Sequence, residues 1–93
     1  MYFDQKEFGK RLKELRMNRS LTQEKLAEDL NISWEHLGRI ERGDKSLSID
    51  LLIVISDYFD VSTDYLLTGK EMSNERRRLL SVIRDLTEIA QTL

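Results

Sequence analysis

The side chains of this chain with the clearest chemical potential are Trp34, Glu35 and Arg39. The apolar residues around them recur at helical spacing, which places these three on the outward side of a short helix. An arginine guanidinium can donate two hydrogen bonds to guanine O6 and N7, a glutamate can accept one from cytosine N4, and a large ring can contact a thymine methyl group. Side chains of these three types are thus able to contact base edges of DNA.

The sequence offers few of the residues and motifs from which catalytic sites are built. The sequence has one histidine, His36, and no cysteine, and it shows no glycine-rich loop and no carboxylates at metal-binding helical spacing. A lone histidine on an exposed helical turn is usually a surface residue. We therefore expect no enzyme, no metal site and no cofactor.

A repeated sequence pattern marks the starts of the helices that position these side chains. Four times, an apolar residue precedes a serine or threonine and a second apolar residue follows five positions after the first. This pattern is typical of a helix whose first backbone N–H groups are capped by a hydroxyl and whose entry angle is set by an apolar contact. The four segments begin at Leu21-Thr22, Ile32-Ser33, Leu47-Ser48 and Val61-Ser62.

Apolar spacing between these starts is helical throughout, and no stretch alternates with a period of two. It predicts helices near 5–18, 22–30, 33–42, 48–59 and 63–67, hence an all-α domain. Asn31, Gly43 and Gly69 are suited to the left-handed conformation that ends a helix. The widest apolar face belongs to 48–59, which we expect to be the most buried helix.

Residues 70–93 form a separate amphipathic segment after a domain at 1–69. Its apolar residues recur at spacings of three and four, like a heptad seam, at Leu79, Val82, Leu86, Ile89 and Leu93. A helix this apolar should not stand alone in water. It either packs on the preceding helices or meets its twin in a dimer, and we expect a dimer contact.

Net charge and the length of the apolar runs limit the partners and the location that we expect for the protein. The formal net charge of −2 argues mildly against nucleic acid, yet six basic residues against two acids lie between Lys6 and Arg19, and acids gather later. The longest apolar run, 51–55, is too short to cross a bilayer, and no secretion signal precedes it. We expect a cytoplasmic protein with no membrane partner.

The stretch from Phe8 to Gly69, about two-thirds of the chain, resembles the phage-repressor-like (Cro/Xre) helix-turn-helix proteins. The matching pieces occur in order and without gaps, and together they are specific: RLKELR at 11–16, LTQEKLA at 21–27, IS at 32–33, RIERG at 39–43 and DVSTDYLLTG at 60–69. The resemblance implies a compact five-helix repressor-like domain. One departure is Asn31, at a turn position where the family usually carries glycine; asparagine tolerates positive φ at a modest cost.

By this resemblance, Trp34, Glu35 and Arg39 hold base-reading positions. Other roles remain open: Arg39 could pair with Glu35, Glu35 could favour the helix dipole, and Trp34 could pack on the first helix. Gly38, also on the outward side, would let the backbone approach the groove.

The remaining candidates position the domain. By the same resemblance, Gln23 contacts the DNA backbone, and Arg16 and Glu41 form a structural ion pair between the first helix and the end of the third. Arg42, Lys45 and Ser46, just after that helix, are further candidates for phosphate contacts.

The expected function is a sequence-specific, repressor-type transcriptional regulator. It would bind double-stranded DNA as a homodimer on a palindromic operator. The alternative is a protein-interaction or antitoxin-type adaptor on the same fold, with weak or no DNA binding. Steep loss of DNA affinity with salt would separate the two.

Overall fold

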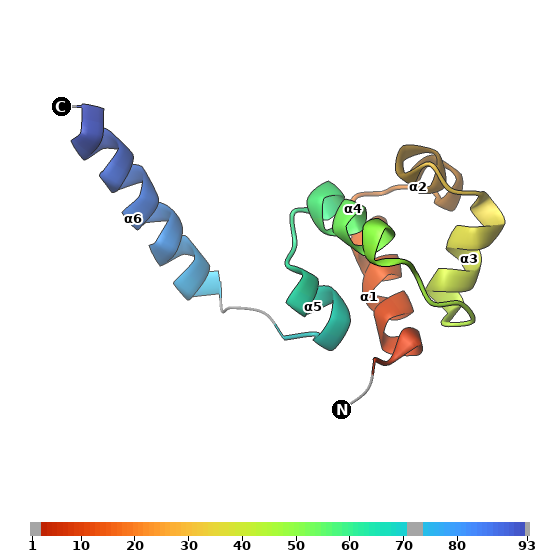
Figure 1. Cartoon of the computed structure of the whole chain (residues 1–93). Helices are drawn as coiled ribbons and strands as arrows, with labels where there is room; N and C mark the ends of the chain where they lie inside the picture. The colour runs from red at the N-terminus through yellow and green to blue at the C-terminus, as the bar shows by residue number, and fades with distance from the viewer. Residues whose placement is uncertain (1–2, 71–73, 93) are drawn as a thin grey trace.

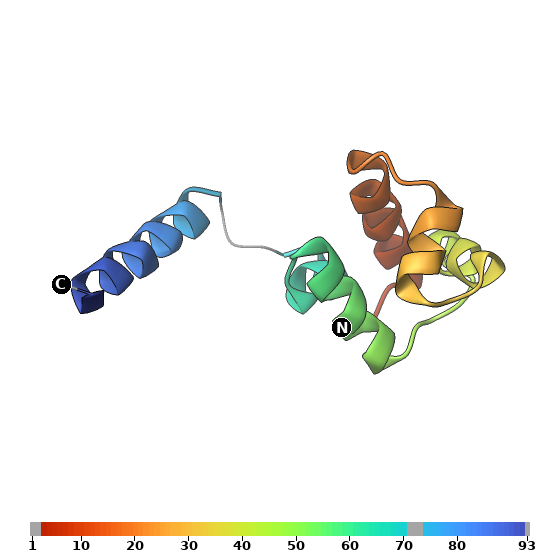
Figure 2. The same cartoon turned by 90° about the horizontal axis from the view of Figure 1, so that it is seen from above.

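The computed structural model describes residues 3–70 and 74–92, and every element of this part of the chain is an α-helix. The helices in chain order are α1 (Gln5–Asn18), α2 (Gln23–Leu30), α3 (Trp34–Arg42), α4 (Ile49–Phe59), α5 (Thr63–Thr68) and α6 (Asn74–Thr92). Helices α1 to α5 cluster into one body, with α3 at its edge, and α6 lies apart from them in both views (Figures 1 and 2). The predicted all-α class is confirmed, and the predicted bounds of α1 to α5 agree within one residue.

The predicted capping hydroxyls are confirmed. Thr22, Ser33, Ser48 and Ser62 each precede a helix in extended conformation, and each side chain accepts a hydrogen bond from the N–H three residues later, at 2.9–3.1 Å. The expected left-handed helix ends are also present, because Asn31, Gly43 and Gly69 have φ of 59°, 78° and 77°. Local sequence therefore sets where the helices begin and end.

The core of the five-helix body draws on all of its helices. Its fully buried large side chains are Phe8, Leu12, Leu26, Leu37, Ile40, Ile55 and Leu66. Ala27 on α2 is also buried, at 2% exposed, and α2 packs against α3. Glu41, at 7% exposed, is the one charged residue that is buried in the described part of the chain.

The expectation that 48–59 would be the most buried helix is wrong. On α4, Leu51, Ile55 and Phe59 are buried, but Ile49, Ile53 and Val54 are 75%, 50% and 45% exposed. The other helices meet α4 on one side only, so the second half of its apolar circumference faces solvent. Apolar content alone does not say how many sides of a helix are covered.

Packing on the preceding helices was one of the two alternatives for α6. The described residues of α6 show no such packing. Its described side chains, at 78–92, are all exposed, among them Leu79, Val82, Leu86 and Ile89 at 52–61%. Leu93, the last residue of the predicted seam, lies outside the described residues. None of the described helices is long and apolar enough to cross a membrane.

Candidate nucleic-acid interface

The predicted base-reading side chains lie together on the structure. A surface hollow of about 240 Å³ is lined by Gln23, Trp34, Glu35, Gly38, Arg39 and Arg42. Five of these residues come from α3 and Gln23 begins α2, so the hollow lies along α3 beside the N-terminal end of α2. Trp34 is 51% exposed, and Glu35 and Arg39 are also exposed. The arrangement offers an indole, a carboxylate and guanidinium groups along one accessible ridge.

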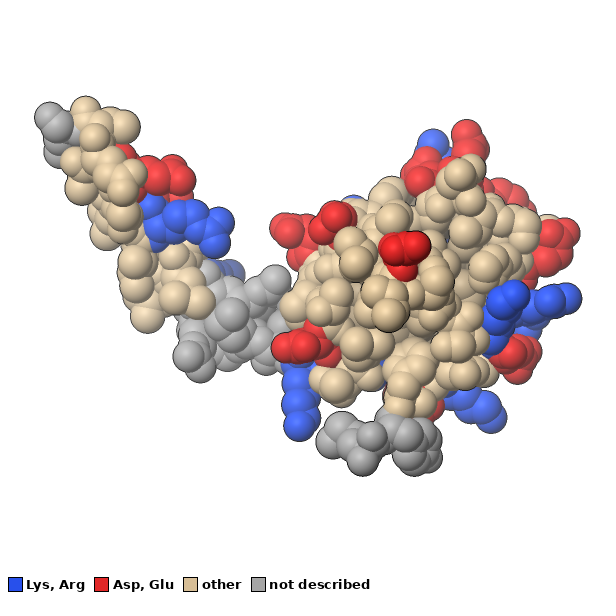
Figure 3. All heavy atoms as spheres, in the orientation of Figure 1, with Lys and Arg blue, Asp and Glu red and all other residues tan. Residues whose placement is uncertain are grey.

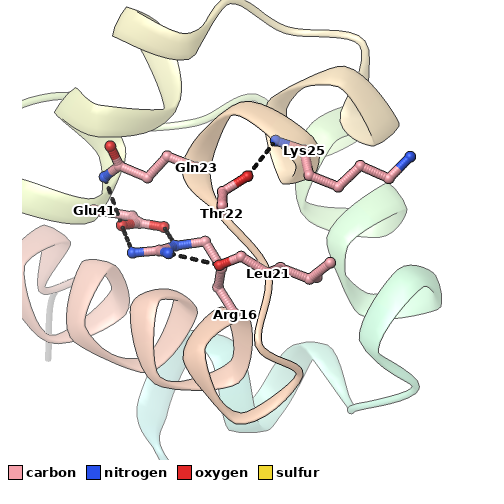
Figure 4. Close-up of polar contacts among 6 residues, drawn as sticks. All are labelled: Arg16, Leu21, Thr22, Gln23, Lys25 and Glu41. Carbon is pink, nitrogen blue, oxygen red and sulfur yellow. Dashed lines mark hydrogen bonds and ion pairs between the residues drawn. The ribbon is translucent and has the colours of Figure 1, made fainter.

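Two features aim this ridge outward. Leu37 and Ile40 occupy the opposite side of α3 and are fully buried in the core. The end of α3 is held by Arg16, whose Nε donates to Glu41 Oε2 at 2.8 Å and whose second terminal nitrogen donates to Oε1 at 3.1 Å (Figure 4). The predicted pair between Arg16 and Glu41 is therefore present in the structure, with two hydrogen bonds.

Gln23 joins this network. Its side-chain Nε2 donates to Glu41 Oε1 at 3.0 Å, while the remaining Arg16 nitrogen donates to the carbonyl of Leu21 at 2.9 Å (Figure 4). One carboxylate thus ties α1, the start of α2 and the end of α3 together. Sequence reasoning gave Gln23 a DNA-backbone role and did not foresee that its amide would bind Glu41.

Gly38 was expected on the outward side, but the structure buries it. A Cβ added there would lie 3.1 Å from a terminal nitrogen of Arg42, because that guanidinium folds back along α3 and covers the glycine. Arg42 Nε also donates to Asp44 Oδ2 at 3.3 Å. Gly38 therefore makes room for the Arg42 side chain at the hollow and does not itself form an exposed gap.

The other candidates are exposed. Lys45 and Ser46 follow α3 in the loop to α4. Among the ion pairs of the described residues, none joins Arg39 to Glu35. The internal pairing that competed with a DNA role for Arg39 is thus not formed in this structure.

The expectation of a surface histidine holds only in part for His36. Its backbone N–H donates to the Ser33 cap, and the residue is only partly exposed. The ring atom Nε2 is buried and has no hydrogen-bond partner among the described residues. The same part of the chain holds no group of three or more acidic or histidine side chains that could bind a metal ion.

Three of the six clustered basic residues serve the fold. Arg16 binds Glu41, Arg11 Nε donates to the carbonyl of Leu66 at 3.0 Å, and Arg19 donates to the carbonyls of Tyr58 and Phe59 at 2.9 and 3.1 Å. Arg19 and Arg11 thus satisfy free carbonyls at the ends of α4 and α5. Sequence reasoning missed these roles, because the partners lie 39 to 55 residues away in the chain.

A second polar contact fastens α2 to α4. Tyr58 donates its hydroxyl to Asp29 Oδ2 at 2.7 Å, and Lys25 pairs with the other oxygen at 3.1 Å. The hydrogen bond from Tyr58, followed by that from Lys25, lowers the pKa of Asp29 below its ordinary value. The same bond raises the pKa of Tyr58. This contact holds the start of the motif against the core.

Known proteins resemble the chain at the level of sequence. A helix-turn-helix family model, HTH_3, matches residues 12–66. The HTH-type transcriptional regulator ImmR of Bacillus subtilis is 43% identical over 67 residues, which cover 72% of this chain and 53% of ImmR. The HTH-type transcriptional activator BcrR of Enterococcus faecalis is 39% identical over 66 residues, covering 71% and 32%. The chain thus spans about half of ImmR and about a third of BcrR.

Solved structures resemble it too. The restriction-modification controller protein C.AhdI of Aeromonas hydrophila superposes with a TM-score of 0.63 at 31% identity, covering 69% of this chain and 97% of the controller protein. The P22 c2 repressor, in complex with a synthetic operator, gives 0.64 at 25% identity, covering 68% and 96%. The residues that the family model matches include all of those that line the hollow. The chain belongs to the helix-turn-helix (HTH_3) family.

Proposed function

We propose that the protein is a sequence-specific, double-stranded DNA-binding transcriptional regulator of the repressor type, with α3 entering the major groove. The observation that carries this proposal is the exposed ridge formed by Trp34, Glu35 and Arg39, which α3 presents beside the first residue of α2. The family membership supports it, as does the similarity to a repressor solved with an operator. The helix adjoining α3 orients the ridge, as the first helix of such a motif must.

The chemistry assigns a role to each residue at the ridge. Arg39 reads a guanine through two hydrogen bonds, Glu35 accepts from a cytosine, and Trp34 contacts a thymine methyl group. Gln23 and Arg42 line the same hollow, and Lys45 and Ser46 follow α3 in the loop to α4. These four residues contact phosphates, and such contacts position the helix without reading sequence. The cationic groups offset the overall charge of −2 where the DNA lies.

The second part of the proposal is a homodimer on a palindromic operator. Each five-helix body occupies one half-site, with half-site centres about 34 Å apart, one turn of B-form DNA. The exposed apolar residues of α6, namely Leu79, Val82, Leu86 and Ile89, together with Leu93, supply the contact between copies. An apolar face of this extent is typical of an interaction surface.

Selection of bound duplexes from a random pool at physiological salt tests both parts. We expect an enriched palindrome and a steep fall in affinity between about 50 and 200 mM salt. Matched alanine variants at Arg39 and Lys70 control for net charge, since both remove one exposed cation but only Arg39 lines the hollow. A pool without enrichment, bound at a strength that salt does not change, would rule out gene regulation through this ridge.

A further inference from the structure

The first observation concerns the uncovered side of α4. Ile49, Ile53 and Val54 are 75%, 50% and 45% exposed, and the exposed acids Asp50 and Asp57 lie on the same side of the helix. In Figure 3 the surface over α4 is mostly uncharged, and the charges on it are acidic. Three β-branched apolar side chains facing solvent along one helix form a larger apolar patch than scattered surface residues do. This acidic and apolar face of α4 has no partner among the described residues.

The second observation is the width of the apolar face of α6. At 3.6 residues per turn, its exposed large apolar side chains cover about half of the helix circumference. They are Leu79, Leu80, Val82, Ile83, Leu86 and Ile89, at 45–61% exposure. A two-helix coiled coil buries only a narrow seam of a and d positions. Pairing α6 with a second α6 would therefore leave part of this face in water.

We propose that α6 of one copy docks on the exposed face of α4 in a second copy, and that the exchange is reciprocal. This inference rests on the homodimer of the proposed function and names the surface on which α6 seats. One two-fold arrangement of this kind covers the apolar face of α4 and that of α6 in both copies at once. Such an isologous contact closes the assembly at two chains.

Charge supports the same pairing. Arg78 and Arg84 lie at the two edges of the apolar face of α6, while Asp50 and Asp57 lie between the exposed apolar residues of α4 around the helix. Glu88 lies at the centre of the polar side of α6, away from the contact, and Asp85 lies on the same edge as Arg78, about two turns later. Opposite charges on the two surfaces of a contact steer association and select the partner surface. The match favours a second copy over an unrelated basic or acidic protein.

The placement of α6 also favours exchange between copies. Both cartoon views show α6 extending away from the body that contains its own α4 (Figures 1 and 2). The most extensive helix contacts within the body join α1 to α3, α2 to α3 and α1 to α5, and α4 is held by α5 and α2. The core of the body is thus formed without α6, and α6 is available to contact a second copy.

The absence of cysteine from the chain makes a cross-linking test direct. Three single variants on α6, Leu79→Cys, Ile83→Cys and Leu86→Cys, are each mixed with Ile53→Cys on α4 and oxidised without DNA. We expect a mixed disulfide dimer with at least one α6 variant. The proposal is overturned if no mixed dimer forms, or if the α6 variants cross-link only to themselves, which would indicate α6 pairing with α6.

A charge inserted into the α4 face gives a second readout. Ile53→Glu should convert the dimer to monomer in sedimentation at micromolar concentration. Met17→Glu is the matched control, because Met17 is a 58% exposed apolar residue on α1, outside the proposed contact. Unchanged helical circular dichroism checks that both variants fold. An Ile53→Glu chain that stays dimeric would contradict the docking.

The outcome separates this inference from the function on which it rests. Cross-linking and sedimentation use no DNA. If a mixed dimer forms but no operator is selected, the proposed interface stands and the proposed gene-control function is wrong. If the dimer selects a palindrome but no disulfide forms between α4 and α6, the proposed function stands and the proposed interface is wrong. Each result identifies which of the two proposals is wrong.

Discussion

Arg16 and Glu41 form a two-bond ion pair inside the five-helix body, with their side chains 11% and 3% exposed. The pair joins α1 to the end of α3, and the amide of Gln23 binds the same carboxylate. A charged pair at this depth has lost most of its hydration, so each partner depends on the other. The orientation of the candidate DNA-reading helix thus depends on one carboxylate.

Replacing Glu41 with alanine should therefore destabilise the domain strongly. The change leaves the Arg16 guanidinium buried without its counter-charge, a loss of about 3 kcal/mol or more in the free energy of unfolding. The thermal midpoint should fall by about 10 °C or more, as measured by circular dichroism. Glu14→Ala, on the exposed side of α1, is the control and should change little. An unchanged midpoint for Glu41→Ala would refute the structural role.

Gly9 is predicted to tolerate no side chain. Helix α1 approaches the end of α3 so closely that a Cβ at Gly9 would lie 2.5 Å from the carbonyl oxygen of Ile40. That oxygen belongs to backbone, which cannot swing aside. Gly9→Ala should thus cost at least about 1–3 kcal/mol, although alanine favours a helix more than glycine does. Denaturant unfolding measures the change, and a variant as stable as the parent would contradict the close approach.

The parts of the fold that could be predicted from the sequence are local ones. Ser33 caps α3 and Asn31 ends α2 because each acts on neighbours within a few residues. The exposure of Ile53 could not be predicted, since periodicity shows that a face is apolar but not what covers it. Arg19 was missed for a related reason: its carbonyl partners on α4 become neighbours only after folding.

The candidate site divides in the same way. The spacing of Trp34, Glu35 and Arg39 predicted a shared exposed side, and the structure places all three at one hollow. The covering of Gly38 by Arg42 was not foreseen, because it depends on a rotamer and on the loop residue Asp44. Sequence spacing predicts which face a residue shares, but packing decides where a long side chain rests.

Tyr58→Phe should raise the pKa of Asp29 toward its ordinary value, because it removes the hydrogen bond that lowers that pKa most. A carboxyl group whose pKa is lower in the folded state adds stability above its unfolded pKa, and this stability is lost as the pH falls through the folded value. The parent should lose stability below about pH 4 through this group, and the variant should lose less of it.

Carboxyl NMR titration of Asp29 in both proteins measures this shift, and Tyr65→Phe is the control, since the structure shows no such bond from its hydroxyl among the described residues. Equal pKa values for Asp29 in parent and Tyr58→Phe would show that the bond is not formed in solution.

Gly38→Ala is expected to separate stability from DNA binding. The new Cβ would meet only the flexible end of Arg42, at 3.1 Å, so the guanidinium can move and the fold keeps its packing. Alanine stabilises a helix relative to glycine by up to about 1 kcal/mol, and the thermal midpoint should hold or rise. Affinity for the selected duplex should fall several-fold, because Arg42 leaves the hollow. A variant with full affinity would show that the resting position of Arg42 has no role in binding.

Arg39→Ala tests sequence reading at the ridge itself. Its guanidinium is exposed beside Trp34 and Glu35 and is free of an ion pair to Glu35, so it can donate two hydrogen bonds to one guanine. Loss of that contact should cost about 1–3 kcal/mol on the preferred duplex and relax preference at one base pair in each half-site. Binding to duplexes substituted at that pair should change much less. If affinity instead falls equally for every sequence tested, Arg39 contacts phosphate and another side chain of α3 reads the base.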